Sequence, residues 1–111
     1  MEKLVYICHP LSTHGDFKEN VEAQKAICRS YFDSKEATPV SPILAFSPFS
    51  PLHRGRHAEV MEMCLALLGR CDEIHVFGEW ELSEGCRREV EFANDRGIQV
   101  VFMKPTTLRG T

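Results

Sequence analysis

The sequence has no long apolar run, no excess of basic residues and no paired-cysteine motif. No stretch of about 18 apolar residues occurs, so we expect no membrane span. The net charge is −3 and both signs are mixed along the chain, which argues against a nucleic-acid-binding face. The five cysteines include no Cys-x-x-Cys pair. We therefore expect reduced thiols in a cytoplasmic protein, with the cysteines packed as small apolar side chains.

Metal and flavin motifs are also absent. The five histidines have no metal-ligand spacing such as His-Glu-x-x-His, so the sequence predicts no metal site and no cofactor. The segment from Pro10 to Gly15 has too few glycines and hydroxyl residues to hold a flavin phosphate. A flavodoxin-like electron carrier is therefore disfavoured, although the fold expected below is of that general kind.

What the sequence does contain is an alternation of apolar runs and amphipathic stretches. Its 111 residues, 43% of them apolar, are enough for one packed domain. We expect this domain to span residues 1–105 and residues 106–111 to form a flexible tail. Strands are predicted at Leu4–Cys8, Thr38–Ile43, Asp72–Phe77 and Ile98–Met103, and helices at Phe17–Ser34, at His57–Arg70 and from Ser83 to about Arg96.

This order predicts an α/β fold, a three-layer sandwich with a four- or five-stranded parallel sheet of flavodoxin-like or Rossmann-like type. Pro39 and Pro42 remove backbone donors from the second strand, which should therefore be an edge strand. The proline-rich segment Leu44–Arg56 is expected to be a long ordered loop. Such sheets bind ligands outside the carboxyl ends of their strands, so we look for the site there.

The turn from Gly78 to Gly85 leads from a buried strand into a helix and is the most informative stretch. Free N–H groups at the helix start, with the Ser83 hydroxyl, are suited to an anion. Glu89 lies one turn beyond Gly85, and helical side chains lean toward the N-terminus, so it should reach back over that glycine. The spacing alone still favours an ordinary capped helix with a solvated Glu89.

Several motifs, taken together, resemble the nucleoside 2-deoxyribosyltransferase-like superfamily, in an uncharacterised branch found in bacteria and phages. The resemblance covers nearly the whole chain. It rests on the motifs Tyr6-Ile7-Cys8-x-Pro10, Pro39-x-x-Pro42, Cys71-Asp72-Glu73-Ile74-His75-Val76-Phe77-Gly78, Ser83-x-Gly85-x-x-x-Glu89-x-x-x-Ala93 and Gly97-Ile98-x-Val100, and on Asn20 and Arg54.

The resemblance implies an N-glycosidic-bond hydrolase or transferase acting on a deoxynucleoside or its 5′-monophosphate. Glu89 would be the nucleophile and Tyr6 would orient it, with a glycosyl-enzyme intermediate as in retaining glycosidases. The partner would be a small nucleoside or nucleotide, and the protein a homo-oligomer. Base preference, and the choice between hydrolysis and transfer, stay open. The substrate-binding residues implied are Pro10, Asn20, Arg54, Gly78, Ser83 and Gly85.

The sequence departs from the superfamily at two positions. Active relatives carry an aspartate where an ungapped comparison places Cys64, so only Glu62 or Glu59, on other faces of that helix, remain as substitutes. Some relatives have a glycine where this chain has Arg87, which alters the space for a nucleobase. The alternative is therefore a catalytically silent nucleotide-binding module with the same fold.

Overall fold

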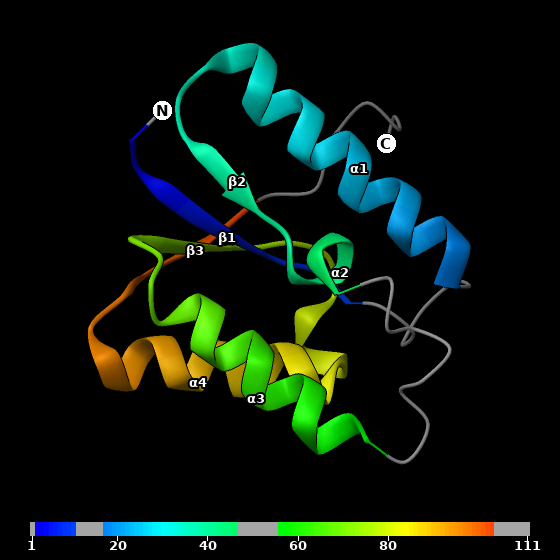
Figure 1. The fold of residues 1–111 in the computed structure, drawn as a ribbon, viewed down its shortest axis with the longest axis vertical. Coiled ribbons are helices and arrows are strands. Elements are labelled where there is room, and N and C mark those ends of the chain that lie inside the picture. The colour runs from blue at the N-terminus through cyan, green and yellow to red at the C-terminus, as the bar shows by residue number, and fades with distance from the viewer. Residues whose placement is uncertain (1, 11–16, 47–55, 104–111) are drawn as a thin grey trace.

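The computed structural model describes residues 2–10, 17–46 and 56–103 of the chain. Within these residues helices and strands alternate, and Figure 1 labels them along the chain. The elements in order are β1 (Leu4–Cys8), α1 (Phe17–Ser34), β2 (Thr38–Val40), α2 (Pro42–Ala45), α3 (His57–Leu68), β3 (Glu73–Val76), the 3-10 turn η2 (Trp80–Leu82), α4 (Glu84–Arg96) and β4 (Gln99–Phe102).

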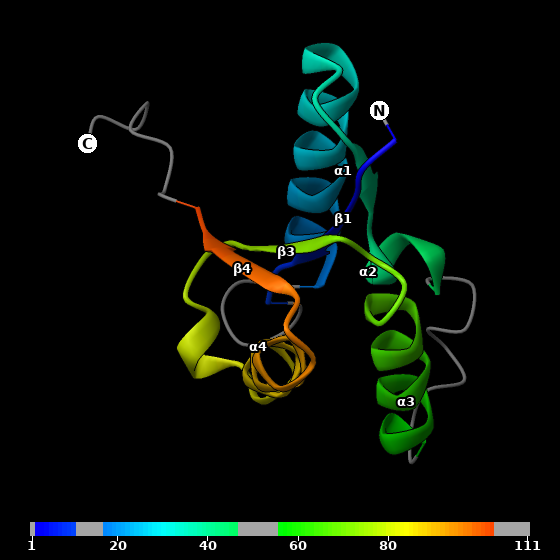
Figure 2. The same cartoon turned by 90° about the vertical axis from the view of Figure 1, so that its left-hand side faces the viewer.

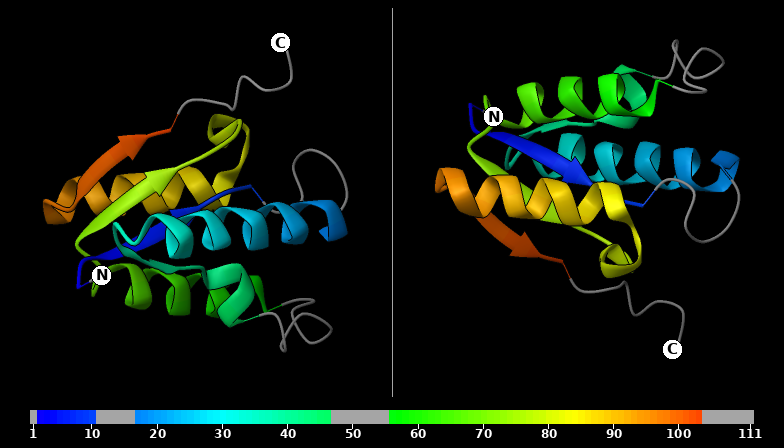
Figure 3. Two further views of the ribbon diagram at one scale, coloured as in Figure 1. Left: turned by 90° about the horizontal axis from the view of Figure 1, so that it is seen from above. Right: turned by 90° about the horizontal axis from the view of Figure 1, so that it is seen from below.

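The four strands form one parallel sheet in the order β2-β1-β3-β4. Both views of Figure 3 show the arrowheads of the strands pointing to one side of the molecule. The apolar segments of β1 and β3 take the centre, where Tyr6 pairs with Ile74 and Cys8 with Val76. The connections leave β1 and β3 in opposite directions, and in open sheets a ligand crevice forms at such a switch point.

Helices cover both faces of the sheet, with α1 on one side and α3 and α4 on the other (Figures 1 and 2). Successive side chains of a strand point to opposite faces. Val5 and Ile7 therefore join Tyr31 in the core beneath α1. Tyr6 and Cys8 join the core beneath α3 and α4. The predicted three-layer sandwich of flavodoxin-like or Rossmann-like type is confirmed.

The prediction for the second strand was partly wrong. β2 ends at Val40, and Pro42–Ala45 forms the short helix α2 where we expected strand and then loop. Ser41 caps this helix by accepting a hydrogen bond from the Leu44 N–H, at 3.2 Å. Pro42 suits the first helical position, where its missing N–H costs no hydrogen bond. The Ser-Pro pair is thus a helix start, and residues 47–55 of the expected loop lie outside the described residues.

The other predicted boundaries agree with the structure within one or two residues. α3 ends at Leu68 instead of Arg70, and the two later strands are each shorter by one residue at either end. Ser83 caps α4 and Gly97 ends it in the left-handed conformation, with φ of 76°, as predicted. Among the described residues, no helix has the length and apolarity needed to cross a membrane.

Candidate functional site

The site is built on a hydrogen bond between the central strand and the helix that follows β3. The Tyr6 hydroxyl donates to Oε2 of Glu89 at 2.6 Å, between side chains far apart in sequence. Tyr6 is fully buried and Glu89 is 7% exposed. Tyr6 points to this face because of its place in the alternation of β1, and Glu89 because it lies on the buried side of α4 with Cys86, Val90 and Ala93. The interpretation of Glu89 as a solvated side chain is excluded.

Burial dominates the electrostatics of this pair. It raises the pKa of Glu89 above the usual carboxyl value, while hydrogen bonds from Tyr6 and Cys8 partly oppose the rise. Burial and the nearby Glu89 raise the pKa of Tyr6 well above that of a free phenol, so the hydroxyl stays protonated and donates. Within the described part of the chain, no salt bridge reaches Glu89. A carboxylate desolvated in this way is suited to nucleophilic or general-base chemistry.

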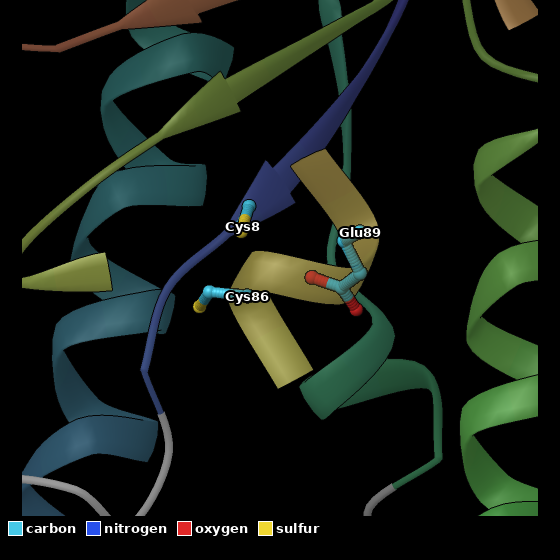
Figure 4. Close-up of side chains that lie close together, drawn as sticks. All are labelled: Cys8, Cys86 and Glu89. Carbon is cyan, nitrogen blue, oxygen red and sulfur yellow. The ribbon is translucent and has the colours of Figure 1, made fainter. Parts of the chain in front are cut away.

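Three cysteine thiols surround the carboxylate. Sulfur atoms of Cys8 and Cys86 and a carboxylate oxygen of Glu89 all lie within 4.8 Å of one another, and Figure 4 shows the three side chains between β1 and α4. Cys64 of α3 is near enough for Glu89 to add to the burial that raises its pKa to about 12. A hydrogen bond with Cys86, burial and Glu89 raise the pKa of Cys8.

We did not single out these thiols from the sequence, because free cysteines inside apolar segments behave as small apolar residues. All five cysteines are free, as expected. One signal was available: Cys86 and Glu89 are three residues apart on a predicted helix, and this spacing places two side chains on the same face.

The turn before α4 has the predicted form, but the Ser83 cap occupies one of the backbone N–H groups at the start of the helix. Oγ of Ser83 accepts a hydrogen bond from the Cys86 N–H at 3.2 Å, so that N–H is not available to an anion. Gly78 has a φ of 69°, and a Cβ there would lie 3.3 Å from Cδ of Pro10. The loops after β1 and β3 therefore meet at the carboxyl edge of the sheet, where Pro10 and Gly78 lie side by side.

Gly85 allows two helices to approach each other. A Cβ at Gly85 would lie 3.2 Å from Cε of Met61, on α3. The position above this glycine, where we expected room for a ligand, therefore borders a flexible methionine side chain. Packing between α3 and α4 is sufficient to explain the glycine.

The two other residues from the sequence assignment are Asn20 and Arg54. Asn20 is buried in the first turn of α1, which covers the opposite face of the sheet from Glu89. Arg54 lies outside the described residues. Its neighbour Arg56 is exposed and pairs with Glu59 at the start of α3.

The structure also bears on Cys64, the position where members of the resembled superfamily carry an aspartate. Cys64 occupies a buried place beside Tyr6 and Glu89, while Glu59 and Glu62 are exposed. Neither glutamate therefore replaces the missing carboxylate in the buried cluster.

Comparison with known proteins identifies a family without an assigned activity. The family model described as a domain of unknown function, DUF7768, matches residues 3–103. No curated protein matches the sequence. The matched region includes every described residue of the site.

Proposed function

We propose that this chain, which belongs to the DUF7768 family, cleaves or transfers the N-glycosidic bond of a deoxynucleoside or its 5′-monophosphate. The observation that carries the proposal is the 2.6 Å hydrogen bond from Tyr6 to the buried Glu89. It joins two residues that the resemblance to nucleoside 2-deoxyribosyltransferases independently assigns to nucleophile and orienting group. The proposal also fits the position of the pair at the β1–β3 switch point.

The hydrogen bond divides the two carboxylate oxygens between two tasks. Tyr6 holds Oε2, which leaves Oε1 to attack the anomeric carbon of the sugar. The bond from that carbon to the base nitrogen breaks, and the base departs with the electron pair and takes a proton from solvent. Water or a second base then attacks the same carbon and releases Glu89, with net retention of configuration.

A second candidate is a nucleotide-binding module without turnover. It is favoured by the buried Cys64 at the position where active relatives have an aspartate. A thiol whose burial raises its pKa to about 12 does not supply the carboxylate's charge at neutral pH. The two candidates share the site around Tyr6 and Glu89 and differ only in whether the leaving base is activated.

The deciding experiment is a base-release assay on all four deoxynucleoside monophosphates and the corresponding nucleosides, read by chromatography. We expect release by the wild-type chain and none by Glu89→Ala. The matched control is Glu91→Ala, which removes an exposed glutamate from the same helix and should leave release unchanged. Equal release from the wild type and Glu89→Ala would contradict the nucleophile assignment.

A binding measurement separates the silent module from a protein with no nucleotide site. A nucleoside 5′-monophosphate at 100 times its Kd should stabilise the fold by about 2.7 kcal/mol, which is seen as a rise in Tm. Stabilisation without base release supports the binding module, and Cys64→Asp is then the variant expected to gain release. Neither stabilisation nor release would contradict both candidates.

A further inference from the structure

The cluster of Cys8, Cys86 and Glu89 brings three side chains of metal-ligating type close together. Its three ligand atoms lie within 4.8 Å of one another, and all three residues are buried, with exposures of 0, 3 and 7%. In a tetrahedral zinc site with bonds of about 2.3 Å to sulfur, two sulfur ligands lie about 3.8 Å apart. Side-chain rotations that move these atoms by about an ångström therefore bring them to ligand spacing.

The backbone arrangement holds the three ligands from two elements. Cys8 ends the central strand β1, while Cys86 and Glu89 share one face of α4, one turn apart (Figure 4). The cap at Ser83 fixes the start of α4, and the helix packs against Tyr6 and Cys8 of β1 in one core cluster, which holds the ligands close to one another.

The chemistry of the donors selects the cation. Two thiol sulfurs and one carboxylate oxygen disfavour Mg²⁺ and Ca²⁺, which take oxygen ligands, and suit Zn²⁺, which accepts both. The only donors placed on Glu89 within the described residues are the neutral groups of Tyr6 and Cys8. A bound cation would supply the positive charge that this buried carboxylate lacks.

We propose that Cys8, Cys86 and Glu89 bind Zn²⁺ or a similar thiophilic divalent cation through two sulfurs and one carboxylate oxygen. Binding forms two metal–sulfur bonds and one metal–oxygen bond, and the two thiol protons pass to solvent. Three protein ligands leave a fourth position for water or a substrate atom. The inference goes beyond the proposed glycosidic activity, and metal on Glu89 occupies the carboxylate that this activity uses.

The test is a metal titration of the full chain, freed of metal and kept reduced with a phosphine. Co²⁺ serves as the spectroscopic probe, because thiolate ligands give it a charge-transfer absorption in the near ultraviolet. Zn²⁺ affinity is measured by competition with a chromophoric chelator. We expect one ion per chain, the charge-transfer band, and displacement of Co²⁺ by Zn²⁺. The absence of stoichiometric binding would overturn the proposal.

Variants locate the ion. Cys86→Ala should weaken Zn²⁺ binding by at least about 100-fold, because losing a ligand costs more than the 10–100-fold typical of outer-shell changes. Cys28→Ala is the matched control: it removes a half-buried thiol on α1, across the sheet, and should bind as the wild type does. Equal losses in the two variants would overturn the assignment.

A second variant changes another proposed metal ligand, so that the test still stands if Cys86→Ala fails to fold. Circular dichroism checks the fold of both variants. Glu89→Gln is close in shape and should keep the thiolate band while its Zn²⁺ affinity falls by at least tenfold. Unchanged affinity in Glu89→Gln would overturn the three-ligand site. No nucleotide is present in these titrations, so their failure is separate from failure of the base-release assay.

Discussion

On each side of the sheet the core contains one buried tyrosine whose hydroxyl meets a titratable side chain. On the α1 face, the hydroxyl of Tyr31 is hydrogen-bonded to Nδ1 of His75, and Nε2 of His75 bonds to Glu73 at 2.8 Å. On the other face, Tyr6 bonds directly to Glu89. Both tyrosines lie in the core, so the contrast between the faces lies in what surrounds the carboxylate.

The pKa values of the two carboxylates, Glu73 and Glu89, shift in opposite directions. Hydrogen bonds from Lys3 and His75 lower the pKa of Glu73, whereas burial raises the pKa of Glu89. The Glu73 network ends in an exposed ammonium group, so its charge is balanced within the fold. Glu89 receives only neutral donors among the described residues. The Glu73 network is therefore a structural feature. The negative charge of Glu89 is not paired with a cation among the described residues, which suits this carboxylate to a ligand or a reacting atom.

The largest expected difference between the two faces is in base release. Glu89→Gln should lower the rate by about 10⁴-fold or more, because the amide cannot form the glycosyl intermediate. Glu73→Gln makes the same chemical change on the other face and should leave the rate unchanged. The measurement is chromatography of released base under single-turnover conditions. Comparable losses in the two variants would show that the site has been placed on the wrong face.

The tyrosines give the next largest effect. Tyr6→Phe removes the hydroxyl that holds Oε2 of Glu89, and the misplaced carboxylate should react about 10²-fold more slowly. Tyr31→Phe should not change the rate, since its hydroxyl meets His75. The same assay reports both, and circular dichroism checks folding. A rate for Tyr6→Phe equal to that of the wild type would remove the orienting role.

Stability should change in the direction opposite to activity. The folded state raises the pKa of Glu89, so the wild type loses stability as pH rises from the unfolded pKa, about 4.3, through the folded one. Glu89→Gln does not ionise and should raise the free energy of unfolding by about 1 kcal/mol at neutral pH. The gain should vanish near pH 4, as measured by urea unfolding. A gain that is constant with pH would contradict burial of the charge as its cause.

The smallest effect is expected for the exposed end of the Glu73 network. The folded state lowers the pKa of Glu73, so its contribution is present above the unfolded pKa and is lost as pH falls through the folded one. Lys3→Ala removes a pair that is half open to solvent and should lower Tm slightly at neutral pH. About 1 M salt should erase the difference, which thermal melts can follow. A large decrease that resists salt would show that the pair is more than a screened surface contact.

Local patterns were sufficient to predict most of the fold. The apolar run Leu4–Cys8 and the capped helix that ends at Gly97 have the predicted positions, because strand alternation, caps and left-handed stops depend on neighbouring residues. The error at Pro42 arose because Pro39 and Pro42 lie three residues apart, a spacing that is compatible with an edge strand as well as with a helix start. The N-cap hydrogen bond of Ser41 decides between them, and it forms only once the chain turns there.

The sequence by itself determined that Glu89 lies on a capped helix that follows a parallel strand, because helical period and capping depend on neighbouring residues, but its spacing favoured a solvated Glu89. Its environment was decided only by the tertiary structure. The sheet order brings β1 beside β3 and hence Tyr6 and Cys8 under α4, where they meet residues from the far end of the chain. Such contacts depend on how layers pack, and no local preference of Cys8, Cys64 or Cys86 encodes them. It is therefore the fold that places these three buried thiols around one desolvated carboxylate.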